Sequence, residues 1–421
     1  MKIQQKYLLI LGAMVFALLF QGCVKDTCTR TYSYTWFEPL YKTTAEVRQS
    51  IKTDPAAVIK TPGKLFIKGN YIFLNEINKG VHIIDNSIPS APVNKGFINI
   101  PGNIDIAVKG NILYADLYTD LITIDISDPM NAITKNIVDN VFPARYYDGF
   151  TTNSSKIVYD WIRHDTTVTV NCTTDNSMFF LDRGVAIQTA ELSSNKAFAG
   201  GSPVGIAGSM ARFALVNEYL YTVGDSEMKS IDISAPANPV IVKTVNLGWG
   251  IETIYPFKDK LFIGSNSGMF IYDISNAAKP IQSGTFSHAR VCDPVIADDD
   301  YAYVTLRNGS TCAGFLNELD IVDIKNLNAP VLVKKYDMTN PHGLSKDGNL
   351  LFICDGSDGL RVLNAANVND INLIKHITGF ETYDVIAYGN LAIMVAKDGL
   401  YQFDYSDTTN ILQLSKIAIS N

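Results

Sequence analysis

The sequence has few charged residues and no basic cluster. Of its 421 residues, 18% are charged, and acidic residues outnumber basic ones by 42 to 35. Lys and Arg do not gather into a run or stripe anywhere along the chain. Because proteins that bind nucleic acid present such a basic surface to the phosphates, we expect no nucleic-acid partner.

The chain also lacks the short motifs that mark metal sites and many hydrolases. Its six cysteines form no CxxC pair, and its five histidines form no HxH or HExxH pattern. A GxSxG nucleophile turn is absent as well. We therefore expect no cofactor and no metal site, and the sequence favours a protein that is not an enzyme.

The apolar run from Tyr7 to Phe20 is too short to span a membrane. Lys2 and Lys6 precede it and Cys23 follows Gly22, which is the layout of a secretory signal. The residues LLFQGC resemble the lipobox of bacterial lipoproteins, in which Cys23 would become the diacylated first residue. A secreted protein with a fortuitous cysteine is the alternative.

These features predict a division of the chain and an address in the cell. We expect a signal peptide over 1–22, a spacer from the lipid anchor over 23–42 and one folded domain over 43–421. Lipid on Cys23 would attach the protein to a membrane of the cell envelope, as an outer membrane lipoprotein that can reach the cell surface. The sequence leaves open which leaflet it faces.

A short strand that ends in an acidic residue and a turn recurs along the folded domain. Examples are GVHIIDNS, DLITIDIS and ELDIVDIK, and the steps between most of the recurring positions are 40, 41 or 50 residues. The recurring positions are Asp85, Asp125, Asp232, Asp273, Asp323, Asn364 and Asp404. A period near forty built from short β-type runs is typical of propeller blades.

Each unit reads as four strands joined by Gly-Asn, Asp-rich or Pro-rich turns. The sequence thus predicts an all-β fold, a single seven-bladed β-propeller of four-stranded antiparallel blades. One step of 107 residues leaves a long insertion at about 144–209, which we expect to be a decorated loop with its own hairpin; a degenerate eighth blade is the alternative. Residues 54–63 resemble an outer strand that helps to close the ring against the last blade.

The repeats resemble the LVIVD-repeat β-propellers of exported bacterial proteins. LDIVDIK carries the namesake motif, and GVHIIDN, IPGNIDIAV, CDPV with AYVTLRNG, and NPHGL with CDG are similar to the version found in lipoproteins of the Bacteroidetes group. The resemblance covers about 63–421 apart from the long insertion. It implies a fold and a location and supplies no catalytic residues, because a shared fold does not confer a function.

Loops from all blades of a propeller converge at the mouth of the central channel, where ligands commonly bind. The polar residues predicted there, and the candidate ligand-binding set, are Lys64, Asp105, Arg212, Glu252, Asp293, His342 and Asp384. Ordinary solvated strand ends would explain the same residues. Two functions remain: a binding or scaffold module for an envelope protein or a glycan, or a hydrolase or lyase at the channel mouth that uses Asp105, Asp293, His342 and Asp384.

Cys292 and Cys312 fall in the same repeat unit, at its first strand and in its inserted loop. An exported protein can form disulfides, so we expect these two cysteines to be bonded and to fix the loop beside Asp293. Two free thiols are the alternative.

Overall fold

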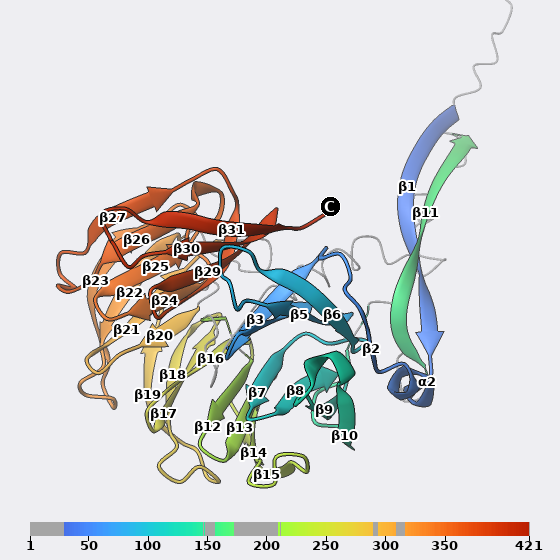
Figure 1. Cartoon of the computed structure of the whole chain (residues 1–421), viewed down its shortest axis with the longest axis horizontal. Coiled ribbons are helices and arrows are strands. Elements are labelled where there is room, and N and C mark those ends of the chain that lie inside the picture. The colour runs from blue at the N-terminus through green and yellow to red at the C-terminus, as the bar shows by residue number, and fades with distance from the viewer. Residues whose placement is uncertain are drawn as a thin grey trace, which may run out of the picture.

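A computed structural model of the chain describes residues 29–145, 147, 156–171, 209–210, 212–288, 294–308 and 316–420. Within these residues, seven antiparallel sheets stand around one axis and confirm the predicted seven-bladed β-propeller (Figure 1). Each blade is formed by four strands in sequence order, with the first strand innermost. Among the described strands, none is exchanged between blades.

Strands of the first four blades have these bounds. They are, blade by blade, β3 (Pro62–Lys68), β4 (Tyr71–Glu76), β5 (Gly80–Asp85) and β6 (Val93–Asn99); β7 (Ile106–Lys109), β8 (Ile112–Leu117), β9 (Asp120–Asp125) and β10 (Ile133–Val138); β12 (Phe213–Val216), β13 (Tyr219–Val223), β14 (Glu227–Asp232) and β15 (Val240–Asn246); β16 (Ile251–Phe257), β17 (Lys260–Ser265), β18 (Gly268–Asp273) and β19 (Ile281–Ser287). A 3₁₀ turn, η1 (Pro129–Asn131), precedes β10.

The last three blades continue the pattern. Their strands are β20 (Val295–Ala297), β21 (Tyr301–Leu306), β22 (Glu318–Asp323) and β23 (Val331–Asp337); β24 (Leu344–Asp347), β25 (Leu350–Cys354), β26 (Leu360–Asn364) and β27 (Asn372–Ile377); β28 (Thr382–Tyr388), β29 (Leu391–Ala396), β30 (Gly399–Asp404) and β31 (Leu412–Ala418). A second 3₁₀ turn, η2 (Gly356–Asp358), lies between β25 and β26.

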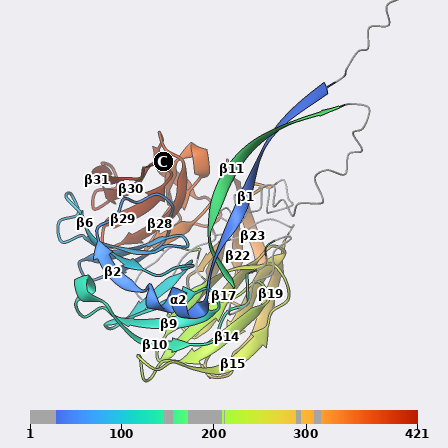
Figure 2. The ribbon, with the colours of Figure 1, turned by 90° about the vertical axis from the view of Figure 1, so that its right-hand side faces the viewer.

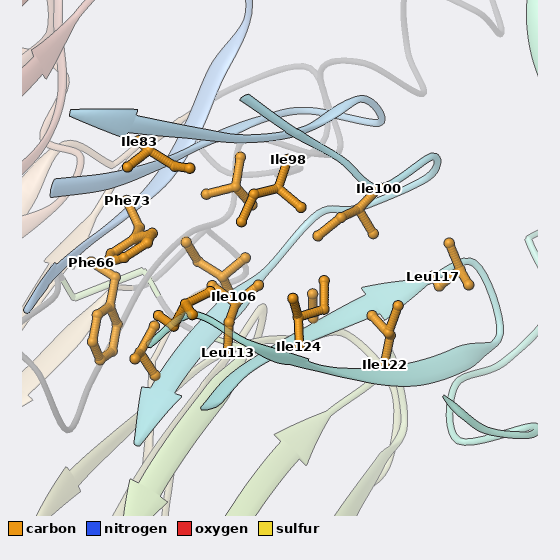
Figure 3. Packing of buried hydrophobic residues seen from close by; sticks show 14 of the residues in the cluster. Phe66, Phe73, Ile83, Ile98, Ile100, Ile106, Leu113, Leu117, Ile122 and Ile124 are labelled. Carbon is orange, nitrogen blue, oxygen red and sulfur yellow. The ribbon is translucent and has the colours of Figure 1, made fainter. Parts of the chain in front are cut away.

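The inner strands are continuous apolar runs because both faces of every blade are buried. Successive side chains of a strand point to opposite faces, so Phe66 of β3 packs against blade 2 while its neighbour Leu65 packs against blade 7. The described residues form seven apolar clusters, one at each contact between adjacent blades. Figure 3 shows the cluster between blades 1 and 2, where Phe73 and Ile83 face Ile106 and Leu113.

The recurring acidic position has a local structural role. In blade 4 the Asp273 carboxylate accepts the main-chain N–H of Ser275 at 2.8 Å, a turn in which a side chain replaces a backbone acceptor. The same contact is made at the other six recurring positions, including Asn364 of blade 6. The motif therefore recurs because every blade needs this turn between its third and fourth strands.

The contact between blades 7 and 1, here called the seam, is closed by side chains and a few hydrogen bonds. Ile393 and its neighbours pack on Leu65 and Ile72. Gln402 donates to the Asn86 side chain at 2.7 Å, and the main-chain N–H of Ser420 donates to the carbonyl of Ile59 at 3.0 Å. The outer strand expected over 54–63 is only partly found, since of these residues Asp54 and Pro55 alone belong to an outer strand, β2 (Lys52–Pro55). It pairs with β6 of blade 1 and not with the last blade.

Residues 29–42, expected to be part of a spacer, instead form a strand. This strand, β1 (Thr29–Lys42), pairs antiparallel with β11 (Ile157–Asn171) from the long insertion. The expectation that the insertion has its own hairpin is therefore wrong for β11, whose partner comes from the start of the described chain. The two-stranded β1–β11 ribbon stands off the propeller (Figures 1 and 2). A short helix, α2 (Thr44–Gln49), joins it to the propeller and begins with a Thr43–Glu46 capping box.

Helices are rare in the described residues, and none of them has the length and apolar character needed to cross a membrane.

Candidate functional site

The inner strands bring three of the predicted residues together near the axis. Lys64 of blade 1, Asp105 of blade 2 and Asp384 of blade 7, here called the axial cluster, interact electrostatically and are almost completely buried. Gly343 of blade 6 leaves the room for this approach, since a Cβ added there would lie 2.1 Å from Oδ1 of Asp384. The structure thus brings these three predicted residues together, and their role in ligand binding stays a prediction.

The end of the long insertion covers the axial cluster. The Lys64 ammonium donates to the carbonyl of Met210 at 3.2 Å, and the hydroxyl of Ser209 accepts the main-chain N–H of Leu344 at 2.7 Å. The main-chain N–H of Ser209 also donates to Asp384. Residues 209–210 therefore contact blades 1, 6 and 7 together, and the cluster is closed off from solvent.

Burial sets the protonation of the axial cluster. It raises the pKa of Asp384 to about 7 and that of Asp105 to about 6, and it lowers the pKa of Lys64 to about 8. The opposite charges of the three groups oppose these shifts, as do the backbone N–H groups that Asp105 accepts from Arg212 and Ile106, both at 2.7 Å. The carboxylates thus orient the backbone of the inner strands.

Two other predicted residues share one interaction partner, Arg307. Glu252 and His342 both interact electrostatically with Arg307. Burial, assisted by the Arg307 charge, lowers the pKa of His342 to about 3, so its ring is neutral at physiological pH. Its Nε2 lies 3.2 Å from the side-chain nitrogen of Asn340. Arg212, by contrast, directs its side chain to Asp225 at 3.3 Å.

Asp293, Cys292 and Cys312 lie outside the described residues, as does Cys23. The disulfide therefore stays a prediction, which non-reducing peptide mapping of the exported protein would test.

Cys354 is a free thiol buried in the cluster between blades 6 and 7. Among the residues that the structure describes, no group of three or more His, Cys, Asp or Glu side chains is arranged to hold a metal ion.

A cavity that the sequence did not predict lies at the base of the ribbon. Its volume is about 540 Å³, and α2, the second blade and the start of β11 enclose it. The residues that line it are Thr44, Arg48, Tyr118, Thr119, Asp120, Asp139, Asn140, Ala144, Arg145, Tyr147, Ile157 and Val158. A volume of this size falls within the range of small-ligand sites.

Two arginines are held in fixed positions at this cavity. Arg48 of α2 makes ion pairs with Asp120, at 2.5 Å, and with Asp139. Arg145 donates to the side chain of Asn78 at 2.6 Å, and its guanidinium lies 4.8 Å from the ring centre of Tyr118. The cavity thus offers paired charges of both signs beside aromatic and aliphatic walls.

Tyr118 has a backbone conformation that is rare for a bulky residue. It lies in the β8–β9 turn with φ of +60°, where the matching turn of blade 1 has Asn78 at φ of +64°. Strain of this kind costs about 1–3 kcal/mol and tends to occur at functional positions. Its ring packs directly on Gly102, whose missing side chain provides the space. Tyr at the turn position that holds Asn78 in blade 1 was the available sequence signal for this site.

Comparisons with known proteins agree with this architecture. A family model described as "LVIVD repeat" matches residues 63–99, 103–140, 207–247, 260–287 and 291–338. A comparison with curated protein sequences found no significant match.

Several solved structures share the fold at very low identity. A protein from Lactobacillus plantarum is 12% identical with a TM-score of 0.53, over 87% of this chain and 96% of that one. The periplasmic gluconolactonase PpgL of Pseudomonas aeruginosa is 10% identical with a TM-score of 0.50, over 88% and 96% of the two chains. Sqt1 of Saccharomyces cerevisiae is 7% identical with a TM-score of 0.50, over 87% and 88%. Likeness at this level of identity establishes the fold alone.

Proposed function

Because this chain is a seven-bladed β-propeller in which five stretches match the LVIVD repeat, we propose that it is a lipid-anchored binding or scaffold module of the cell envelope. Lipid on Cys23 attaches it to the outer membrane, and the propeller holds a protein partner or a glycan. A closed ring of blades suits this role, since it presents loops and insertions on a rigid frame.

The observation that supports a binding role most directly is the cavity at the base of the ribbon. Arg48 is already positioned by Asp120 and Asp139, and Arg145 by Asn78, so a ligand finds oriented donors and acceptors without a large ordering cost. Tyr147, which is buried and meets Trp161 edge-on at 5.5 Å between ring centres, adds an aromatic wall. Paired polar groups beside aromatic rings fit either a sugar or a short peptide segment.

Crosslinking and affinity capture from membranes would test this role. The full-length protein should recover a specific partner or glycan, and Ala144→Trp, at an exposed residue on the cavity wall, should reduce recovery by about tenfold, as expected when a contact is blocked sterically. Val331→Trp is the matched control, because Val331 is 61% exposed on the outer strand of blade 5. Equal recovery by both variants would exclude the cavity as the binding site.

The lipid anchor requires a separate test. Cys23→Ala should abolish metabolic labelling with fatty acid and leave an unprocessed precursor or a soluble product, because only the Cys23 thiol can be acylated at this position. Labelling that persists in Cys23→Ala would contradict the anchor and leave the cavity test unaffected.

One observation favours the alternative function, a hydrolase or lyase at the channel mouth. Asp384 has a pKa raised to about 7 by burial and lies near Lys64, a combination that acid–base catalysis often uses. Substrate would have to displace residues 209–210 to reach it. Hydrolysis of model ester or glycoside substrates that Asp384→Asn abolishes, at unchanged thermal stability, would establish this alternative.

A further inference from the structure

The β1–β11 ribbon is a long, isolated element. Its register runs from Thr29 opposite Asn171 to Lys42 opposite Ile157, and none of the other described strands pairs with it. Figures 1 and 2 show that the end at Thr29 lies farthest from the propeller. Two-stranded ribbons are only marginally stable in water by themselves. An element of this kind gains stability when one of its faces is covered.

The two faces of the ribbon differ sharply in chemistry. One face carries hydroxyl groups that hydrogen-bond across the strands, Thr31 with Thr169 at 3.1 Å and Ser33 with Thr167 at 3.0 Å. Thr35 continues the row and donates to Asp165 at 2.5 Å. This hydroxyl face is polar along its whole distal half and is well suited to water.

The opposite face carries aromatic side chains in the same distal half. Tyr32 and Tyr34 alternate with the hydroxyl residues, and Trp36 stacks on His164 with ring centres 4.2 Å apart. Val168 lies opposite Tyr32. These four side chains, Tyr32, Tyr34, Trp36 and Val168, are here called the aromatic face, and each is partly exposed to solvent.

Acidic residues are confined to the other end of this side of the ribbon. Glu38 and Asp160 lie closer to the propeller than Trp36 does, and Glu38 contacts His164 at 3.0 Å. Between Tyr32 and Trp36 the aromatic face carries no acidic or basic side chain. The apolar part of this side therefore lies in the distal half of the ribbon.

The chain beyond this end leads to the proposed anchor. Cys23 precedes Thr29 by six residues, which span at most about 20 Å when fully extended. Acyl chains on Cys23 would thus hold the distal end of the ribbon close to the bilayer. Tyr and Trp are the side chains that favour the membrane–water interface, because each combines an apolar ring with a polar group.

From this arrangement we propose that the aromatic face contacts the lipid–water interface, with the hydroxyl face toward water. The ribbon then fixes the orientation of the propeller relative to the membrane, and the cavity at its base is held at a defined height. This inference rests on the proposed function, because the lipid anchor on Cys23 is what brings the ribbon to the membrane. The contact between the aromatic face and lipid does not itself require acylation of Cys23. Since the protein is acidic overall, with a net charge of −7, neutral lipids are the expected surface.

A tethered vesicle experiment tests the contact without the native lipid. Residues 24–421 carry an N-terminal hexahistidine tag and are attached to phosphatidylcholine vesicles that contain a nickel-chelating lipid. A Trp36-only chain (Trp161→Phe, Trp249→Phe) reports on the aromatic face, and a Trp249-only chain (Trp36→Phe, Trp161→Phe) is the control, since Trp249 is 83% exposed on a loop of the propeller. Brominated phosphatidylcholine, which quenches tryptophan only on close approach, is the readout.

We expect brominated lipid to reduce the emission of Trp36 by about twofold and to leave Trp249 unchanged, because only the aromatic face enters the interface. Adding Tyr32→Ser and Tyr34→Ser to the Trp36-only chain should remove most of the quenching. Thr31→Ala with Ser33→Ala, on the hydroxyl face, should leave it unchanged. Circular dichroism and thermal melts verify that all variants are folded.

Unquenched Trp36 in the tethered protein would overturn the inference. So would quenching that the Tyr32→Ser and Tyr34→Ser pair does not alter, or vesicle-independent dimers that the same pair disrupts, since the face would then bind a second copy. Loss of fatty-acid labelling at Cys23 is a different result: it would refute the anchor and leave the vesicle measurement to stand by itself.

Discussion

The recurring acidic residue illustrates how one side chain serves every blade. In blade 4, hydrogen bonds from the side chain and then the main chain of Ser275 lower the pKa of Asp273 to about 2. Lys260 is a further, weaker contributor at 3.1 Å. The role requires an acceptor oxygen two residues before a free N–H, and Asn364 shows that a neutral amide performs it equally.

Asp273→Ala should lower the free energy of unfolding by about 0.5–1 kcal/mol at pH 7, because the turn loses its side-chain acceptor. Asp273→Asn should keep nearly all of this stability, because the Asn364 side chain accepts the same hydrogen bond in blade 6. The contribution of the ionised Asp273 to the free energy of unfolding is complete above about pH 4. It is lost as the pH falls toward 2, since the pKa of Asp273 in the folded state lies below the usual value. Urea titrations at pH 7 and pH 3 measure this; equal stability of the Ala and Asn variants would contradict the turn's role.

Asp320, in the namesake motif of blade 5, has a raised pKa, in contrast to the lowered pKa of Asp273. It is 1% exposed, one of its carboxylate oxygens has no hydrogen-bond partner, and burial together with nearby Glu318 raises its pKa to about 6. Lys335 lies 3.6 Å away and is shared with Glu318. The folded state therefore binds the Asp320 proton more tightly than the unfolded chain does.

This raised pKa means that Asp320 reduces stability as the pH rises from about 4 through 6. Asp320→Asn should accordingly increase the free energy of unfolding by about 1–2 kcal/mol at pH 8, because no buried charge has to be stabilised. At pH 5, in the middle of this window, about half of the difference should remain. Thermal melts of both proteins across pH 5–8 are the measurement, and a destabilised Asn variant at pH 8 would show that the Lys335 contact outweighs burial.

At the scale of the strand, blades are joined by polar contacts that repeat from one to the next. The hydroxyl of Tyr221 in β13 donates to the carbonyl of Ala277, in the Pro-rich connector of the following blade, at 2.9 Å, and Ser230 donates to the same carbonyl at 2.8 Å. Tyr114 of β8 makes the matching contact with Pro236 at 2.9 Å. These bonds fix the connector, whose proline cannot pair as a strand.

Tyr221→Phe should destabilise the protein by about 1 kcal/mol, the usual value for one neutral hydrogen bond, with no change in the packing of the ring. Ser230→Ala should cost little by itself because Tyr221 still satisfies the carbonyl of Ala277. The double variant should cost more than the sum of the two, which a double-mutant cycle in urea would detect. Additive losses would indicate that water replaces the missing donor.

The blades could be predicted from the sequence because each blade has the same pattern of burial and the same turn. Both faces of each blade are buried, so every unit carries the same apolar runs and the same Asp or Asn turn. The ribbon was not predicted, because pairing of β1 with β11 joins segments separated by more than a hundred residues and belongs to no repeat. The alternation of hydroxyl and aromatic residues in TRTYSYTWF was its one local signal.

The site was predicted only in part for a similar reason. Equivalent positions in the repeats identified Lys64, Asp105 and Asp384 as neighbours, since the inner strands of a ring converge. Their burial could not be predicted, because it depends on where residues 209–210 return from the insertion. The cavity at the ribbon base depends on α2, blade 2 and β11 together, and these are distant in sequence.

As a whole molecule, the propeller is a ring in which no blade has a free face. The seam buries Ile393 completely, just as the contact between blades 3 and 4 buries Ile263. Ile393→Ala and Ile263→Ala should each cost about 2–5 kcal/mol, and the protein should melt in one transition in both cases. Calorimetry would measure this. A seam variant with an unchanged melting temperature would mean that blades 7 and 1 are separated in solution.

The seam also sets an order of events in time. Blade 1 is synthesised first, yet the apolar face formed by Leu65, Ile72 and Leu74 is covered only by residues from the last blade, more than three hundred positions later in the chain. Until then this face is open to solvent and to other unfolded chains, the condition in which large proteins aggregate. We therefore expect ring closure to be a late step of folding, and the face of the first blade has to stay shielded from other unfolded chains until the last blade has been made.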